Sequence, residues 1–259
     1  MNRSRLKTPR DIEELRRSGR ILAYVLLELR ERAAAGVSLS VLDREAQKLL
    51  AASGAESAFF GYKPEGAHEA YPAHICTSVN EEVVHGLPDK RILKDGDVLS
   101  LDLGVRLGTY VTDGALTVII GKGTDEARRL VAATEAALSR AVLTCVLGKR
   151  LGDVGHAVEK TALNSGFKVI RNLVGHGVGF ALHEHPDVYN FGEPGTGEAL
   201  QEGLVIAIEP MLSPGASRAI QKKDGSFVTE DGSLSAHAEV TVAITASGPE
   251  VLTPLYKVS

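Results

Sequence analysis

Apolar residues recur with helical spacing in the first part of the chain. Thr8 followed by Pro9 is typical of a helix start. The apolar positions that follow at helical spacing are Leu15, Ile21, Leu22, Val25 and Leu26. Ser38 and Ser40 are alternative caps for a second helix. Its predicted buried face consists of Leu39, Leu42, Ala46 and Leu49. The pattern therefore predicts two consecutive helices before any strand.

The second part of the chain shows the same order of elements. Apolar spacing predicts helices over residues 127–146 and 154–163. Segments rich in β-branched residues or glycine are predicted to be strands. They are residues 97–104, 110–120, 173–179, 204–211 and 236–244.

An internal repeat explains this shared order. Residues 36–42 (GVSLSVL) recur in pattern as residues 148–154 (GKRLGDV). Residues 93–102 (LKDGDVLSLD) recur as residues 200–209 (LQEGLVIAIE). Helices that come in pairs and strands that come in meanders favour an α+β fold over a Rossmann-like sheet.

The repeat also predicts the domain organisation. We expect one domain spanning residues 1–259, with no long linker inside it. Its halves, residues 8–120 and 124–245, should be related by a pseudo-twofold axis around a central antiparallel sheet. A chain of 259 residues is long enough to bury a sizeable core in this way.

Composition narrows the class of protein. The chain is 44% hydrophobic and 24% charged with a net charge of -4, so it lacks the basic excess of surfaces that bind DNA or anionic membranes. Cys76 and Cys145 lie in apolar surroundings, and buried free thiols are favoured over a disulfide. The apolar run at residues 21–27 is too short to span a bilayer, and no cleaved signal is evident. A cytoplasmic protein is expected.

Two carboxylates end apolar runs at equivalent places in the repeat. Asp102 follows residues 98–101 (VLSL), and Glu209 follows residues 204–208 (LVIAI). A buried carboxylate is costly unless a cation or another partner neutralises it. Because the pseudo-axis would bring equivalent positions face to face, the pair predicts a functional site between the halves.

Three more polar residues are candidates for that site. Asp113 can return beside Asp102 through a hairpin, although Asp113 next to Gly114, taken alone, favours a simple turn. Glu239 lies in an alternating strand, where it could also be a solvent-facing acid. His176 stands among glycines that permit close backbone approach, and a structural role is the alternative.

Together these residues have the composition of a metal centre. Four carboxylates and one imidazole suit divalent Mn, Fe, Co or Zn, and are sufficient to bridge two ions. Such a pair of ions supports hydrolysis. His85 and His183 lie beside glycine or proline turns and are candidates for holding substrate or stabilising an oxyanion, with surface-loop roles as the alternative.

At this point the chain resembles the type I methionine aminopeptidases of the pita-bread metallopeptidase family. The resemblance spans nearly the whole sequence. Besides the acidic positions, it rests on residues 76–88 (CTSVNEEVVHGLP), 175–179 (GHGVG), 208–211 (IEPM) and 234–239 (LSAHAE). It implies the pita-bread fold and removal of the N-terminal methionine ahead of a small second residue.

The resemblance also implies roles for individual residues. Asp102 and Glu239 would bridge two divalent ions, Asp113 would chelate one, and His176 with Glu209 would hold the other. Glu209 would also exchange protons with water. His183 would contact the scissile peptide, and His85 would assist the leaving amine. The substrate-binding residues would be Phe59, Tyr62, Tyr71, Cys76, His85 and His183. Implied partners are peptide or nascent-chain N-termini, including those at the ribosome, bound by a monomer without nucleic acid or membrane.

The chain departs from the family pattern around the substrate pocket. Residues 63–70 (KPEGAHEA) are an apparent insertion after Tyr62, and Leu182 stands where an aromatic residue is usual. His237 replaces a usual glutamine, and His185 replaces a usual glutamate.

Two alternative functions remain open from the sequence. One is a proline-specific pita-bread peptidase, although such enzymes usually carry an additional N-terminal domain. The other is a non-catalytic binding protein on the same fold, although such relatives typically lose the metal ligands and gain basic tails.

Overall fold

The computed structural model describes residues 4–63 and 69–258. The predicted insertion at residues 63–70 therefore lies largely outside the described residues. The helices are α1 (Pro9–Arg32), α2 (Leu39–Ala52), α3 (Asp125–Thr144) and α4 (Leu151–Asn164). Among them, none is long and apolar enough to cross a membrane.

The strands form antiparallel sheets. The first has the order β1 (Glu56–Ser57), β4 (Val98–Leu107), β2 (Cys76–Val79), with β5 (Tyr110–Ile119) also paired to β4. The second has the order β15 (Gly248–Val251), β14 (Val240–Thr245), β9 (Val205–Ile208), β7 (Gly175–Gly177), β8 (Glu184–Val188). A third, smaller sheet has the order β13 (Ala236–His237), β10 (Met211–Ser213), β6 (Lys168–Val169). A fourth has the order β11 (Ala219–Gln221), β12 (Phe227–Thr229), β3 (Glu82–Val84).

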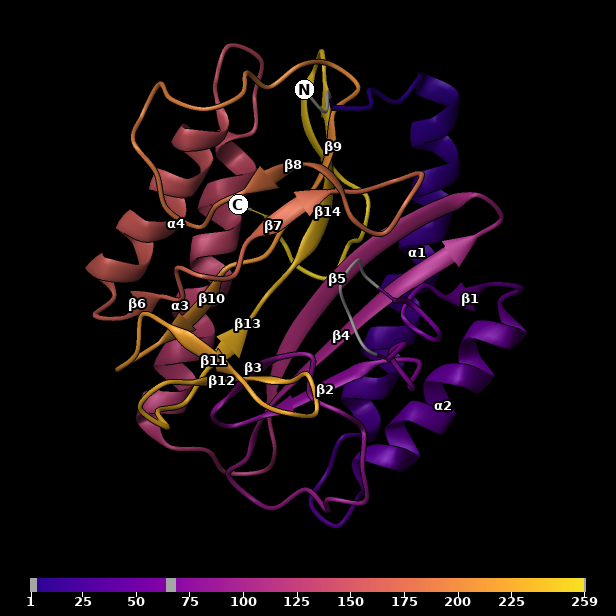
Figure 1. Cartoon of the computed structure of the whole chain (residues 1–259), viewed down its shortest axis with the longest axis vertical. Coiled ribbons are helices and arrows are strands. Elements are labelled where there is room, and N and C mark those ends of the chain that lie inside the picture. The colour runs from indigo at the N-terminus through magenta and orange to yellow at the C-terminus, as the bar shows by residue number, and fades with distance from the viewer. Residues whose placement is uncertain (1–3, 64–68, 259) are drawn as a thin grey trace.

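Each pair of helices covers its own sheet. Figure 1 shows α1 and α2 on one side of the molecule and α3 and α4 on the other, with the strands between them. Leucines of α1 and α2 pack with β4 in one apolar cluster, and residues of α3 and α4 pack with β9 and β14 in another. The paired helices and strand meanders predicted from the repeat are thus present in both halves.

Capping residues determine where the helices begin. Thr8 caps α1 as predicted: its hydroxyl accepts the backbone N–H of Asp11 at 3.3 Å, and the Asp11 carboxylate accepts the N–H of Thr8 at 2.8 Å. Ser38 occupies the cap position of α2 but makes no cap hydrogen bond with its side chain. The fourth helix begins at Leu151, earlier than predicted, because the Asp153 carboxylate accepts the N–H of Arg150 at 2.8 Å.

Several strands are shorter than the sequence predicted. The segment 173–179 contributes only β7, and the segments 204–211 and 236–244 are each interrupted. The first interruption, between β9 and β10, contains Pro210, which has no N–H for a ladder. At the first interruption the chain passes from β9 in the second sheet to β10 in the β13–β10–β6 sheet. At the second it returns from β13 in that sheet to β14 in the second sheet.

The two large sheets meet at a backbone bridge between Ala115 of β5 and Glu239. The N–H of Glu239 donates to the carbonyl oxygen of Ala115 at 2.9 Å, and the N–H of Ala115 donates to that of Glu239 at 3.3 Å. Glu239 lies between β13 and β14, so the second interruption is the point where the halves join. Cys76 and Cys145 are buried free cysteines, as predicted.

Gly19 tests how closely α1 packs against the C-terminal segment. A Cβ added there would lie 2.1 Å from the carbonyl oxygen of Leu252. Alanine normally stabilises a helix relative to glycine by about 1 kcal/mol. We expect Gly19→Ala to lower the free energy of unfolding by about 1 kcal/mol or more instead, because the backbone must shift. Urea unfolding measures this change; the exposed neighbour variant Arg20→Ala is the control, and a stabilised Gly19→Ala protein would contradict the packing.

Candidate metal centre and its cavity

The hairpin of β4 and β5 places two carboxylates on one face of the first sheet. Asp102 is paired with Ala115, and Gly104 is paired with Asp113, so the two aspartates are diagonal neighbours. Asp113 therefore belongs to a strand and not to a turn. Both side chains are buried, with 8% and 4% of their residue surface exposed.

His176 and Glu209 come from neighbouring strands of the second sheet. His176 lies in β7 and pairs with Ala207 of β9, and Glu209 follows the last residue of β9. Nε2 of His176 is 3.6 Å from Oε1 of Glu209 and 3.7 Å from Oδ2 of Asp113. Gly175 permits this arrangement, because a Cβ there would lie 2.4 Å from the carbonyl oxygen of Ala207. The imidazole thus lies between carboxylates of the two halves.

Glu239 enters the same cluster from the join between the halves. Alternation in the segment 236–244 left open a solvent-facing acid, but Glu239 is only 2% exposed. Both faces of this segment are buried, since Val240 and Thr241, which point to opposite faces of β14, are both fully covered. Nε2 of His237 lies 3.7 Å from Oε2 of Glu239 and 3.7 Å from Oε2 of Glu209.

Burial and mutual repulsion shape the charge of this cluster. Burial, together with the neighbouring carboxylates, raises the pKa of Asp102, Glu209 and Glu239 well above the usual range. Burial raises the pKa of Asp113 to about 7 against the hydrogen bond from the Gly114 N–H. These carboxylates can all be ionised near neutral pH only if a cation compensates them.

His176 can act as an uncharged metal ligand. Burial lowers the pKa of His176 to about 4, so its ring carries no charge at neutral pH. With the proton on Nδ1, that N–H donates to the carbonyl oxygen of Gly177 at 2.9 Å. The lone pair of Nε2 is then free beside the carboxylates, as a metal ligand requires.

The donor atoms fit divalent cations. Oδ1 of Asp102 and Oε1 of Glu239 are buried and have no hydrogen-bond partner among the described residues. Asp113, His176 and Glu239 form one group whose ligand atoms lie within 4.8 Å of one another, and Glu209, His237 and Glu239 form a second. The two groups share Glu239, which is the arrangement expected for a carboxylate between two ions.

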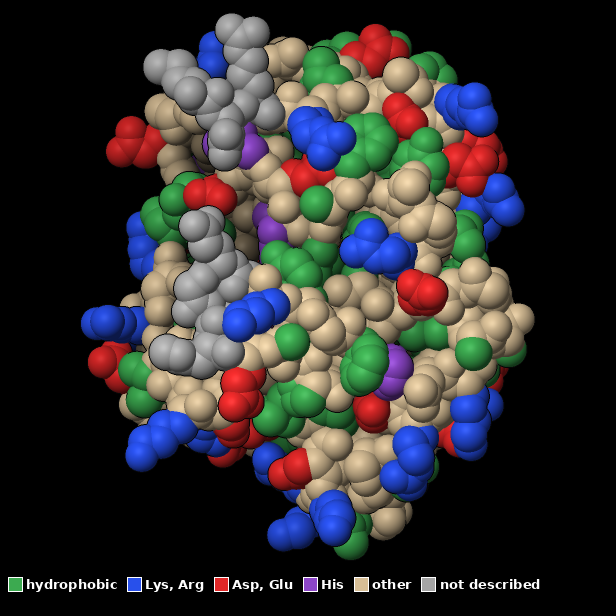
Figure 2. Space-filling model, turned by 45° about the vertical axis from the view of Figure 1, so that its right-hand side comes forward, with side chains coloured by type: hydrophobic (Ala, Val, Ile, Leu, Met, Phe, Trp, Pro, Cys, Tyr) green, Lys and Arg blue, Asp and Glu red, His purple; other side chains and the backbone are tan. Residues whose placement is uncertain are grey.

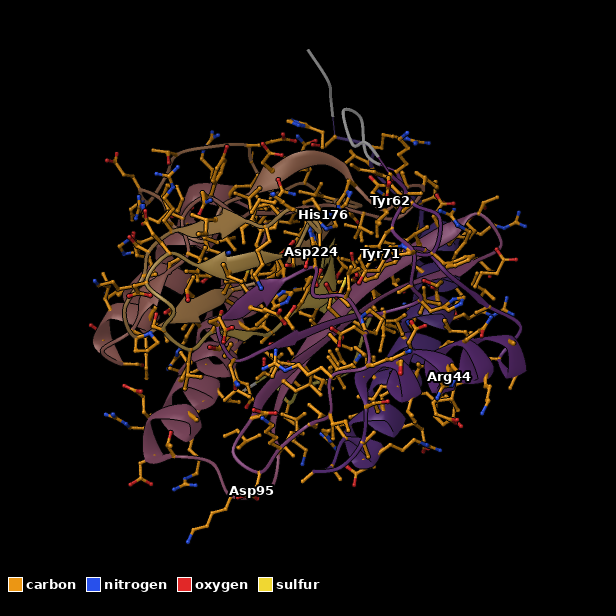
Figure 3. The ribbon with its side chains drawn as sticks, turned by 60° about the horizontal axis from the view of Figure 1, so that its bottom comes forward. Arg44, Tyr62, Tyr71, Asp95, His176 and Asp224 are labelled. Carbon is orange, nitrogen blue, oxygen red and sulfur yellow. The ribbon has the colours of Figure 1, made fainter. Side chains whose placement is uncertain are left out.

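A cavity of about 1140 Å³ opens onto the cluster. Figure 3 shows Tyr62, Tyr71, His176 and Asp224 around this part of the molecule, away from Arg44 and Asp95. All residues predicted to bind substrate line the cavity. They are Phe59, Tyr62, Tyr71, Cys76, His85 and His183. Leu182, which departs from the family pattern, lines it as well, and so do residues 221–225 at the end of β11 and in the turn after it.

The cavity wall near Phe59 is apolar and firmly held. Phe59 contacts Tyr71 edge to face at a centroid distance of 6.3 Å. The Tyr71 hydroxyl lies within hydrogen-bond distance of the carbonyl oxygens of Ile75 and Gly86, at 3.0 and 3.1 Å. Gly104 makes room for Phe59, because a Cβ there would lie 2.7 Å from Cε1 of the ring.

His183 lies at the cavity next to the cluster. Its Nδ1 is 2.7 Å from the Tyr62 hydroxyl, and its ring lies edge to face with His176 at a centroid distance of 4.4 Å. His85 also lines the cavity; its φ is positive, at 60°, and its ring packs edge to face on Phe227. His185 is separate from the cluster, with Nε2 3.4 Å from the Glu198 carboxylate.

A buried ion pair fixes the segment that carries His183, and the sequence did not reveal it. Nζ of Lys7 donates to Oε2 of Glu184 at 2.6 Å, and their side chains are 1% and 5% exposed. The other carboxylate oxygen of Glu184 accepts the backbone N–H groups of Phe180 and Ala181. The N-terminal segment thereby holds the loop before β8 in place.

The sequence model of metallopeptidase family M24 matches residues 13–246. The chain belongs to metallopeptidase family M24. M24 metallopeptidases use divalent metal ions, in agreement with the donor set described above.

Relatives of this M24 chain extend over nearly its whole length. It is 45% identical to the methionine aminopeptidase of Aquifex aeolicus, with 96% of this chain and 98% of the relative covered. It is 40% identical to methionine aminopeptidase 1 of Bacillus subtilis, with 95% and 98% covered. The crystal structure of methionine aminopeptidase from Thermotoga maritima superposes with a TM-score of 0.93 at 41% identity, covering 97% of this chain and 99% of that one.

More distant structures share the fold. The prolidase from Pyrococcus furiosus has a TM-score of 0.78 at 22% identity, and the match covers 97% of this M24 chain but 66% of the prolidase. These likenesses confirm the pita-bread fold that the resemblance predicted.

The ion pair of Lys7 and Glu184 gives a test of how the His183 loop is positioned. Removing one partner of a buried pair leaves an uncompensated charge, so we expect Lys7→Met to lower the free energy of unfolding by about 3 kcal/mol. Peptidase kcat/KM should fall as well, because the loop carrying His183 loses a fixed contact. Denaturant unfolding and steady-state kinetics measure the two effects.

Lys48→Met, which removes an exposed pair with Glu45, is the matched control and should change neither quantity appreciably. The double variant Lys7→Met/Glu184→Gln should recover part of the lost stability. Equal stability of Lys7→Met and the unmodified chain would contradict the structural role of the pair.

Proposed function

We propose that the chain is an aminopeptidase that removes the N-terminal methionine from nascent proteins and peptides and favours a small second residue. The observation that carries this is the pair of metal-ligand groups that share Glu239 at the base of the cavity. The names of relatives 36–45% identical over nearly the full chain support methionine as the residue removed. The prolidase-type structures support only the fold, so the proline-specific alternative is not favoured.

In this proposal the metal ligands are Asp102, Asp113, His176, Glu209 and Glu239. The two halves would act as one catalytic unit, since each contributes ligands across the Ala115–Glu239 bridge. When bound, two divalent ions (Co, Mn, Fe or Zn) would supply Lewis-acid polarisation of the scissile carbonyl and a water of lowered pKa. The acidic surroundings would also attract the free α-amino group of the substrate, which accounts for removal of one terminal residue.

Glu209 would exchange protons during hydrolysis. It is the least buried of the carboxylates in the cluster and lines the cavity, so water can reach it. It would accept a proton from the attacking water and deliver it to the leaving amine.

His183 and His85 would act on the substrate peptide. If the Tyr62 hydroxyl donates to Nδ1 of His183, the proton of that ring is on Nε2 and can be donated to the oxygen of the scissile peptide. His85 also lines the cavity. It would lie beside the residue that follows the scissile bond and assist departure of the amine of that residue. Phe59, Tyr62, Tyr71 and Cys76 would contact the methionine side chain.

The surface supports action on peptides without nucleic acid or membrane. Figure 2 shows Lys and Arg side chains interspersed with Asp and Glu over the visible face, and the net charge is -4. The chain would act as a monomer in the cytoplasm, on free peptides and on nascent chains at the ribosome.

Glu209→Gln tests the proton-transfer role. The amide is similar in size but cannot accept a proton, so we expect kcat/KM to fall by about 100-fold or more. Circular dichroism should show an unchanged fold. The exposed acid Glu202, on the turn before β9, supplies the control Glu202→Gln, which should retain normal activity. Near-normal turnover by Glu209→Gln would contradict the assigned role.

A substrate comparison tests methionine removal. The metal-loaded protein is assayed in parallel on Met-Ala-Ser and on Xaa-Pro-Ala peptides, with other N-terminal residues included. We expect Met-Ala-Ser to be cleaved fastest, because the apolar part of the cavity wall around Phe59 and Leu182 accommodates an unbranched thioether side chain. Faster turnover of the Xaa-Pro substrate would favour the proline-specific alternative.

A further inference from the structure

His237 is buried against the metal centre and has no partner in the protein. It is 1% exposed, and neither Nδ1 nor Nε2 has a hydrogen-bond partner among the described residues. Its backbone is fixed, since its N–H donates to the Thr117 hydroxyl at 2.9 Å and its carbonyl oxygen accepts from that hydroxyl at 2.7 Å. These two hydrogen bonds hold the backbone from which the ring extends toward the metal centre.

The ring faces two carboxylates at a distance that is too long for a hydrogen bond. Nε2 is 3.7 Å from Oε2 of Glu209 and 3.7 Å from Oε2 of Glu239. An imidazole N–H bonded to oxygen spans about 2.7–3.2 Å. Donors that bind one zinc ion with bonds of about 2.0–2.2 Å lie about 3–4 Å from each other. The spacing is that of ligands around a shared cation.

His237 also approaches the carboxylates from within the protein. Glu209 and Glu239 line the cavity, whereas His237 is not among the lining residues. Substrate and bulk water consequently do not reach its ring nitrogens. The family pattern has glutamine here, so this chain carries an additional imidazole beside its metal centre.

We propose that Nε2 of His237 is a ligand of the metal centre, completing a set with Glu209 and Glu239. The inference rests on the proposed function in that it requires a divalent metal centre. It makes the two metal positions of this chain similar, with one imidazole each: His176 for one group and His237 for the other. A second nitrogen donor would favour borderline metals such as Zn, Co or Fe over Mn.

The test counts imidazole ligands in the protein loaded with two equivalents of Co²⁺. A histidine that coordinates through Nε2 keeps its proton on Nδ1, and paramagnetic Co²⁺ shifts that exchangeable signal far outside the normal proton NMR range. We expect two such signals in the unmodified chain, both lost in D₂O. His237→Gln should remove one signal and His176→Gln the other, while His156→Gln, on α4, should retain both.

Metal affinity provides a second measurement that is independent of turnover. We expect His237→Gln to weaken binding of Co²⁺ at one position by about tenfold or more in calorimetric titration, with circular dichroism showing that the variant is folded. His156→Gln should bind Co²⁺ as the unmodified chain does.

The outcomes separate the inference from the proposed function. A single exchangeable shifted signal in the unmodified chain, retained in His237→Gln, would overturn the inference and leave the metalloenzyme assignment intact. A chain that binds no Co²⁺ would overturn both. The count in the unmodified chain decides the question even if His237→Gln is unstable.

Discussion

The backbone bridge between Ala115 and Glu239 holds carboxylates of the two halves close together despite their mutual repulsion. It joins the two large sheets by a pair of backbone hydrogen bonds, at the residue that both metal-ligand groups share. Burial at this seam raises the pKa of Asp102 and Glu239, so the closed arrangement is compatible with ionised ligands only around cations. The metal centre and the contact between the halves are therefore one structural feature.

Two of the proposed metal ligands, Glu209 and Glu239, lie where strands of the second sheet are interrupted. The chain leaves the second sheet after Ile208 and re-enters it at Val240, and Glu209 and Glu239 lie at these two points. The two interrupted segments are hydrogen-bonded to each other, since the N–H of Ala238 donates to the carbonyl oxygen of Pro210 at 3.2 Å. The departure from regular strands thus places two carboxylates side by side at the base of the cavity.

Contacts from distant segments position the groups around this centre. Lys7 reaches Glu184 and fixes the loop that carries His183, and Tyr62 contacts the ring of that histidine directly. The cavity lining combines these polar contacts with the apolar surface of Phe59 and Leu182. Rigid support of this kind is what a hydrolytic site needs to orient a peptide beside a metal centre.

Sequence alone determined the local and the repeated features. The start of α1 at Thr8 and Pro9 and the paired helices follow from short-range patterns, and the equivalence of Asp102 and Glu209 follows from the repeat. A buried acid at the end of an apolar run signals a site, because its burial requires compensation.

Tertiary structure decided what depends on contacts between distant segments. Alternation around Glu239 could not show that both faces of that segment are covered, because the second face is buried by other parts of the fold. The ion pair of Lys7 with Glu184 has no sequence signal at all. His237 was visible only as a departure from a family pattern; its buried, unpartnered ring and its distance to Glu209 and Glu239 exist only once β9 and β13 are brought together by the fold.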